Sequence, residues 1–271
     1  MEEPRKVMQV SGLNVTMKTK QGLLPLIQNI HFDLKQGQVL GLVGESGSGK
    51  TVTCSSLLQL PSQQAIREGS IQLNGRELNG LPQQEMQRIR GKEIGFIMQN
   101  PMNAFTPVYT IGHQFMETIR MHCKMSKKQA FELVAVCLEN VNLPEPSRLM
   151  KLYPFQLSGG MLQRVMIALS MCLKPAVVIA DEPTTALDVV NQLQVLKQLE
   201  RLRAECGTTI LLITHDLGVI AEMADEVIVM HQGSIVEQAD VFELFDAPKN
   251  EYTKTLLNAR LKLPASLKMR T

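Results

Sequence analysis

Short aliphatic runs separated by polar and glycine-rich stretches give the chain its dominant pattern. The clearest of these runs occupy 39–43 (VLGLV), 177–180 (VVIA) and 210–213 (ILLI). Short runs that are apolar throughout, without alternation, are typical of strands buried on both faces of a parallel sheet. Helical patterns follow these runs at 50–60, 189–205 and 217–224. The repeat of strand, loop and helix predicts a parallel α/β sheet that binds ligands at the carboxyl ends of its strands.

The middle of the chain has a different pattern. Amphipathic helical periodicity recurs there with no intervening strand pattern, at 111–123, 127–140 and 158–173. We therefore expect an inserted helical lobe over 101–172, with a turn at the proline-rich 144–146.

Shorter β patterns lie towards the two ends. The first forty residues, 71–73 and 226–230 are expected to form antiparallel β elements, with turn signals at Asn74-Gly75 and Gln232-Gly233. The stretch 240–271 is expected to form a short helical extension, to which no chemistry is assigned. Its length and this organisation favour one domain over 1–271 that contains the inserted lobe.

Composition narrows the class of protein. The chain is 44% hydrophobic and 20% charged, which is ordinary for a globular protein and argues against disorder. Its net charge of +2 gives no reason to expect a nucleic-acid partner. The cysteines have no CxxC pair and no metal-ligand spacing, so we expect reduced residues at Cys54, Cys123, Cys137, Cys172 and Cys206.

The chain start carries acidic residues where a signal peptide would carry basic ones. Its longest aliphatic stretches, near 177–180 and 210–213, are much shorter than the roughly 20 residues of a membrane helix. We expect a cytoplasmic location. If the protein serves a membrane process, it is expected to do so from the membrane surface.

A phosphate-binding motif follows the first aliphatic run. The segment Gly44-Glu45-Ser46-Gly47-Ser48-Gly49-Lys50-Thr51 fits G-x-x-x-x-G-K-[ST], between a predicted strand and a predicted helix. Its glycines allow backbone N–H groups to surround phosphate oxygens, above the positive end of the helix. Lys50 is expected to contact the β and γ phosphates, and Thr51 to ligate Mg²⁺. The alternative is a glycine-rich turn with an incidental lysine.

Two acidic residues end the second aliphatic run. Asp181 can hold Mg²⁺, and Glu182 can polarise the attacking water as a general base. Paired acids at a strand end can equally cap the following helix, so this motif alone is ambiguous. Because a phosphate loop lies upstream, we favour a site of nucleotide hydrolysis over a helix cap.

The segment Leu157-Ser158-Gly159-Gly160-Met161 resembles the signature sequence of ABC transporter ATPases. In the family, the signature of one subunit caps the γ-phosphate that a second subunit holds. The resemblance therefore implies that Ser158, Gly159 and Gly160 bind ATP in a head-to-tail dimer. Met161 replaces the usual glutamine, as in peptide and nickel importers. A purely structural role, in which Ser158 is a helix N-cap followed by flexible glycines, is compatible with this function.

Further residues match the family in chain order over 7–258. Gln99 resembles the Q-loop glutamine, which touches magnesium or the attacking water and joins the sheet to the helical lobe. Asp188, in Ala186-Leu187-Asp188, resembles the D-loop at the dimer interface. His215 resembles the switch histidine at the γ-phosphate, although a lone histidine is more often structural. Met17 occupies the place of the aromatic residue that stacks on adenine, where its thioether offers less area.

The resemblance implies a subunit that binds ATP and Mg²⁺ and powers an importer from the cytoplasmic face of the cell membrane. It implies as partners a second ATPase subunit, a paralogue before an identical copy, two permease subunits and an extracytoplasmic solute-binding protein. Segments 97–112, 180–189 and 247–253 resemble the oligopeptide, dipeptide and nickel subclass. The ending at Thr271, without a cysteine-bearing extension, puts nickel, cobalt, zinc or a metal chelate first as cargo and peptides second. An exporter ATPase and a soluble ABC ATPase acting on nucleic acid or ribosomes rank behind both.

Overall fold

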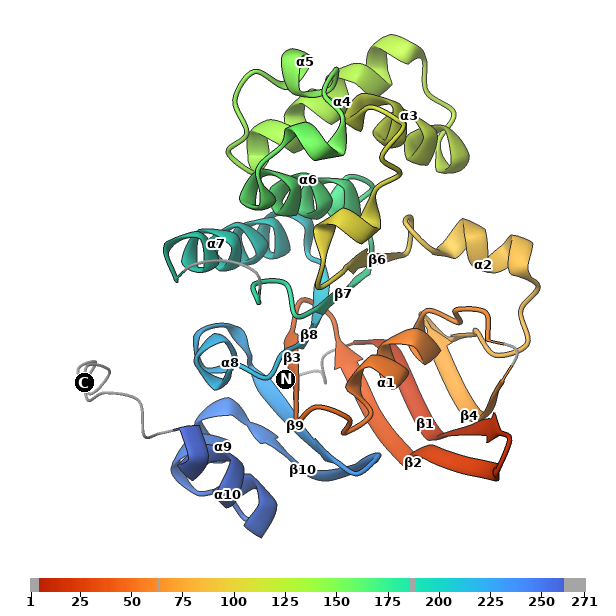
Figure 1. Ribbon diagram of the computed structural model, residues 1–271, viewed down its shortest axis with the longest axis vertical. Helices are drawn as coiled ribbons and strands as arrows, with labels where there is room; N and C mark the ends of the chain where they lie inside the picture. Colours follow the sequence, from red (N-terminus) through yellow and green to blue (C-terminus); the bar gives the residue numbers. More distant parts are fainter. Residues whose placement is uncertain (1–4, 63, 186–188, 261–271) are drawn as a thin grey trace.

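The computed structural model describes residues 5–62, 64–185 and 189–260. A six-stranded sheet forms its centre, in the order β10-β9-β3-β8-β7-β6 (Figure 1). Its strands are β3 (Val39–Val43), β6 (Ile94–Ile97), β7 (Val177–Asp181), β8 (Thr209–Ile213), β9 (Glu226–His231) and β10 (Ser234–Asp240). The second sheet has the order β2-β1-β4-β5, with strands β1 (Lys6–Thr19), β2 (Gly22–Lys35), β4 (Ala65–Leu73) and β5 (Arg76–Glu77).

The α-helices are α1 (Lys50–Leu57), α2 (Gln83–Ile89), α3 (Ile111–His122), α4 (Lys127–Asn140), α5 (Pro146–Leu149), α6 (Gly159–Met171), α7 (Val189–Cys206), α8 (Leu217–Met223), α9 (Val241–Asp246) and α10 (Glu251–Arg260). Two short 3-10 helices, η1 (Pro101–Ala104) and η2 (Pro154–Gln156), complete the list of described elements. None of the helices described is long and apolar enough to span a bilayer.

The central strands are buried on both faces, as their continuous apolar pattern predicts. Along β3, Val39 and Val43 belong to one hydrophobic cluster, whereas Leu40 and Leu42 belong to another. The first cluster joins one sheet face to helices α3, α4 and α6. The second joins the opposite face to α1 and the antiparallel sheet. The six-stranded sheet therefore separates two cores and fixes its strand ends between them.

The predicted antiparallel assignment of 226–230 is wrong in part. Strand β9 belongs to the central sheet and runs parallel to β3, pairing Leu40 with Glu226, while it is antiparallel to β10. A buried apolar strand does not reveal its direction by composition. The turn at Gln232-Gly233 is confirmed, because both residues have positive φ, 47° and 80°, as a tight hairpin requires.

Within 101–172, all regular elements are helical, and α3, α4 and α5 lie at the end of the molecule opposite α9 and α10 (Figure 1). The helix boundaries predicted in this region lie within two residues of those of α3, α4 and α6. Several short elements were not predicted, among them α2, α5 and β6. Helix α2 has only seven residues, and β6 has only four, IGFI, which is too short for a clear period.

Candidate functional site

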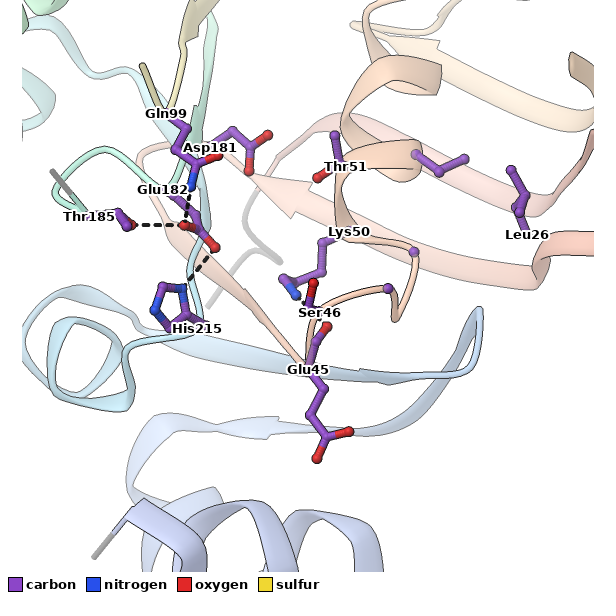
Figure 2. Close-up of a pocket in the computed structure, with 13 residues that line it drawn as sticks. Leu26, Glu45, Ser46, Lys50, Thr51, Gln99, Asp181, Glu182, Thr185 and His215 are labelled. Atoms are coloured by element: carbon purple, nitrogen blue, oxygen red, sulfur yellow. Dashed lines mark hydrogen bonds and ion pairs between the residues drawn. The ribbon is translucent and has the colours of Figure 1, made fainter. Parts of the chain in front are cut away.

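Four adjacent parallel strands bring the predicted polar residues to one edge of the sheet. Strands β3, β8, β7 and β6 are neighbours in that order and run in one direction. Lys50 follows β3 through the phosphate loop, and His215 follows β8. Asp181 ends β7, Glu182 comes next, and Gln99 follows β6. Figure 2 shows these five side chains around one space.

That space is a cavity of about 680 Å³. Its lining residues are Leu26, Glu45, Ser46, Gly47, Gly49, Lys50, Thr51, Val52, Gln99, Asp181, Glu182, Thr185 and His215. The volume lies within the usual range for small-molecule sites. Gly44 and Ser48, the remaining residues of the phosphate motif, are buried and are not among the lining residues.

The phosphate loop encloses the ammonium group of Lys50. Its Nζ atom donates to the carbonyl oxygens of Gly44 and Glu45, at 2.8 Å each. The loop ends at Gly49, whose φ of 107° is readily adopted only by glycine and which is the N-cap of α1. The backbone turns of the loop thus place a lysine and a helix N-terminus beside the same cavity.

Gly44 is required because the backbone of β9 approaches it closely. A Cβ atom at this position would lie 2.3 Å from the carbonyl oxygen of Met230. The β9–β10 turn supports the loop again, since the N–H of Gly233 donates to the carbonyl oxygen of Ser48 at 3.0 Å. The phosphate loop is therefore shaped by strands far away in sequence as well as by its own glycines.

Three side chains hold the carboxylate of Glu182. Gln99 Nε2 and Thr185 Oγ1 each donate to Oε2 at 2.8 Å, and His215 Nδ1 lies 2.8 Å from Oε1. Burial raises the pKa of Glu182, but the hydrogen bonds from His215 and Thr185 and the positive charge of Lys50 outweigh this effect and lower it overall. Glu182 is therefore held as the carboxylate, the form that a general base needs.

The pKa of the neighbouring carboxyl group, Asp181, is shifted in the opposite direction. Burial, together with the negative charge of Glu182, raises the pKa of Asp181 to about 6, although Lys50 acts against this shift. Two adjacent carboxyl groups in one partly buried site thus differ in proton affinity. Such a separation is typical of sites that bind a cation or move protons.

Glu182 has a backbone conformation that is rare for a residue with a side chain. Its φ is 48°, in the left-handed region. The turn is held by a hydrogen bond of 2.8 Å from the Glu182 N–H to the Ile213 carbonyl oxygen. Gln163, almost fully buried in α6, donates from Nε2 to the Pro183 carbonyl oxygen at 2.6 Å. Strain of this kind persists only where the surroundings enforce it, and it is frequent at functional sites.

The donors present fit a magnesium ion that is bound mainly through a nucleotide. Thr51 and Gln99 supply neutral oxygens at the cavity wall, and Asp181 supplies a carboxyl group whose raised pKa a nearby cation would lower. Among the described residues no cluster of three or more His, Cys, Asp or Glu side chains could hold a metal alone. Magnesium commonly uses one or two protein carboxylates and completes its shell with phosphates and water.

The signature residues lie elsewhere in the chain. Ser158 is the N-cap of α6 and accepts the N–H of Met161 at 3.3 Å, which confirms the capping interpretation. Ser158 and Gly159 are exposed, Gly160 is half-buried, and none of them lines the cavity. The structure thus does not bring the signature to the phosphate loop of the same chain.

The predicted adenine contact, Met17, is half-buried in β1 and does not line the cavity, whereas Leu26 of β2 does. Val15 pairs with Ile27 and Thr16 with Pro25, which leaves Leu26 as the extra residue of a β-bulge. Asp188 lies outside the described residues.

Sequence reasoning missed Leu26, Val52 and Thr185 as lining residues. Thr185 was within the quoted segment 180–189, and its hydroxyl was the available signal. Leu26 and Val52 carry no polar group that would have distinguished them from core residues.

Comparisons with known proteins agree with this geometry. The family model described as ABC transporter matches residues 27–185. The chain is 43% identical over 270 residues to the glutathione import ATP-binding protein GsiA of Salmonella choleraesuis (strain SC-B67), covering 97% of this chain and 43% of that protein. It is 42% identical over 259 residues to the oligopeptide transport ATP-binding protein OppD of Escherichia coli (strain K12), covering 96% and 77%. The chain therefore spans less than half of the length of GsiA.

Solved structures share the fold. The dimeric post-hydrolysis structure of the ATP-binding cassette MJ0796, bound to ADP and Pi, has a TM-score of 0.77 and 26% identity, with 86% of this chain and 98% of that chain covered. The cbiO1 structure from Clostridium perfringens, part of the transporter complex cbiONQ, has a TM-score of 0.75 at 23% identity, with 96% and 97% covered. The fold is that of the ABC ATPases, and this chain belongs to the ABC transporter family.

Proposed function

We propose that this chain binds ATP with Mg²⁺ in the described cavity and hydrolyses it to power an importer. The observation that carries the proposal is the convergence of a phosphate loop with its lysine, two carboxyl groups and a histidine on one cavity. Its membership of the ABC transporter family supports the same conclusion.

Each role follows from the position of the side chain. Lys50, beside the loop, places a positive charge where the β and γ phosphates would lie. Glu182, kept ionised, orients the attacking water for in-line displacement. His215 supplies a hydrogen-bond partner for the charge that develops on the γ-phosphate. Gln99 contacts Glu182 and precedes the helical region in the chain, so it couples changes in the site to movement of those helices. Thr51 and Asp181 would hold a magnesium ion, which would neutralise charge on the phosphates.

The carboxylate of Glu182 already has three partners in the structure. Its oxygens accept from Gln99 and Thr185 and contact His215. An ionised carboxylate can accept about four hydrogen bonds, so one acceptor position remains for the attacking water. We therefore propose that Glu182 binds this water while its present contacts hold the carboxylate in place.

A second subunit completes the site in this proposal. Ser158, Gly159 and Gly160 do not line the chain's own cavity, which is compatible with contact to a γ-phosphate held by another subunit. Asp188 is assigned to the same interface. The partner ATPase is a paralogue before an identical copy, and two permease subunits, a solute-binding protein and a location at the cytoplasmic face of the membrane complete the proposed system. Nucleic acid is not a proposed partner.

The proposed cargo is a small peptide. Sequence reasoning placed nickel or metal chelates first and oligopeptides second. The relatives are described as glutathione import and oligopeptide transport proteins, which favours the second reading. We therefore rank peptides, including glutathione-like thiol peptides, above metal chelates.

The proposed ATPase activity is tested by measuring ATP turnover and ATP-dependent dimerisation of wild type and Glu182→Gln. Wild type should hydrolyse ATP, and Glu182→Gln should bind ATP, lose hydrolysis and accumulate as a dimer, because the base is lost while the binding contacts remain. Glu222→Gln, an exposed position on α8, is the matched control and should behave as wild type. Wild type that fails to bind ATP, or Glu182→Gln that hydrolyses normally, would refute the proposal.

Cargo is tested in the assembled transporter. ATP turnover of the reconstituted complex should rise when the binding protein is loaded with glutathione or an oligopeptide, and not with a nickel chelate. Stimulation by the nickel chelate alone would return metal import to first place.

A further inference from the structure

Helix α10 reaches the phosphate loop through one side chain. The backbone N–H of Glu45 donates to the hydroxyl oxygen of Tyr252 at 3.3 Å. Tyr252 lies in the segment 247–253, to which the proposed function gives no role. Its ring is half-buried, and burial raises the pKa of its hydroxyl, so it is a neutral phenol at physiological pH.

The contact matters because the carbonyl oxygen of the same peptide group binds Lys50. The carbonyl oxygen of Gly44 and the N–H of Glu45 belong to one trans peptide group and point in opposite directions. That carbonyl oxygen accepts from Lys50 Nζ at 2.8 Å, while the N–H donates to Tyr252. The Gly44–Glu45 peptide plane is therefore held from both sides, by the phosphate-loop lysine and by the tyrosine.

Tyr252 is itself fixed by two groups of contacts. Its ring lies against the imidazole of His231, with centroids 3.9 Å apart and planes tilted by 32°. His231 ends β9, next to the turn whose Gly233 supports the phosphate loop. A hydroxyl held in this way can define the orientation of the Gly44–Glu45 peptide together with Lys50.

The start of α10 is equally constrained. Glu237 of β10 accepts the N–H groups of Lys249 and Asn250 at 2.7 and 3.0 Å. Asn250 Oδ1 in turn accepts the N–H of Tyr252 at 2.8 Å, and Asn250 Nδ2 donates to the carbonyl oxygen of Val236 at 3.3 Å. These hydrogen bonds tie the first turn of α10 to the edge strand of the central sheet.

We propose that Tyr252 is a positioning residue for nucleotide binding, which orients the Gly44–Glu45 peptide and thereby Lys50. The inference rests on the proposed function and adds to it a contribution from the C-terminal helix. It assigns to the 247–253 segment the task of holding the phosphate loop in its binding-competent form before nucleotide arrives. Loss of the hydroxyl allows the Gly44–Glu45 peptide to rotate. ATP binding must then reorder the loop, and the free energy of this step weakens binding.

Tyr252→Phe tests this assignment because it removes the hydroxyl and keeps the ring on His231. The expected results are a melting temperature lowered by about 2 °C, faster hydrogen exchange of the peptide that contains Glu45 in the nucleotide-free protein, and a KM for ATP raised about fivefold with kcat nearly unchanged. Fivefold corresponds to one neutral hydrogen bond of about 1 kcal/mol. His231→Ala should change exchange and KM in the same direction.

The chain contains a matched control. Tyr109 and His113 form another tyrosine–histidine ring pair, with centroids 4.5 Å apart, at the start of the helical region, and neither residue lines the cavity. Tyr109→Phe should leave exchange of the phosphate loop and KM unchanged.

Unchanged exchange in Tyr252→Phe overturns the inference, as does faster exchange with an unchanged KM. A lower kcat at constant KM also overturns it, because the defect would then lie in chemistry and not in binding. Wild-type protein that binds no ATP refutes the proposed function, whereas the exchange measurement needs no nucleotide and still decides whether Tyr252 holds the loop.

Discussion

Neutralising Asp181 should stabilise the nucleotide-free protein while it removes activity. Burial beside Glu182 raises the pKa of Asp181 from 3.8 to about 6. A carboxyl group with a raised pKa binds a proton more readily in the folded state, so the unfolding free energy falls as pH rises through the window from about 4 to 6. Above that window the folded protein carries the full cost of an ionised Asp181.

The size of this cost follows from the shift. A pKa difference of about 2 corresponds to ~3 kcal/mol. Because the carboxyl group is partly exposed, solvent screening reduces the effect, and we take about half, ~1.5 kcal/mol. Asp181→Asn keeps the shape and cannot ionise, so its melting temperature at pH 8 should exceed that of wild type by about 3 °C.

Thermal melts of both proteins without nucleotide, from pH 4.5 to 8, measure the effect. The difference should shrink towards pH 4.5, where Asp181 of wild type is protonated as well. Asp246→Asn, at an exposed position on α9, is the control and should change the melting temperature little. Equal melting temperatures at pH 8, or a gain that does not depend on pH, would refute the electrostatic reasoning.

Three further substitutions test individual contacts. Gly44→Ala should destabilise the fold by ~2–3 kcal/mol in urea unfolding and abolish ATP binding, because its Cβ would meet a β9 carbonyl oxygen at 2.3 Å; stability equal to wild type would contradict this close approach. Gln163→Leu leaves the carbonyl oxygen of Pro183 without its donor and should cost ~1–3 kcal/mol in the same assay, with slower hydrolysis. Thr185→Val removes a donor that lowers the pKa of Glu182, so the acidic limb of the pH profile of kcat/KM should move to higher pH; an unmoved limb would exclude that role.

The sheet and most of the site were accessible from sequence for a common physical reason. Strands buried on both faces must be apolar throughout, and the residues that follow them meet at one edge, so Lys50, Asp181 and Glu182 could be assigned to one site. His215 and Gln99 were assigned to it through the resemblance to ABC transporter ATPases. The direction of a strand does not change its apolar pattern. For this reason β9 was predicted to be antiparallel, whereas it pairs in parallel with β3.

The side chains that were missed depend on irregular backbone. Leu26 lines the cavity through a β-bulge, whereas the period of the strand would favour its neighbours. Thr185 reaches Glu182 because Glu182 itself is in the left-handed region, a conformation that its residue type does not predict. Tyr252 meets Glu45 across 207 positions of sequence, a separation at which local patterns carry no information.

That last separation has a consequence for synthesis of the chain. The phosphate loop leaves the ribosome before β9, the β9–β10 turn and α10, which shape it and follow far later in the sequence. Contacts between distant segments form late and slowly in folding. The nucleotide pocket should therefore mature only after α10 has been synthesised, which would keep nascent chains that lack this helix from capturing ATP before they can use it.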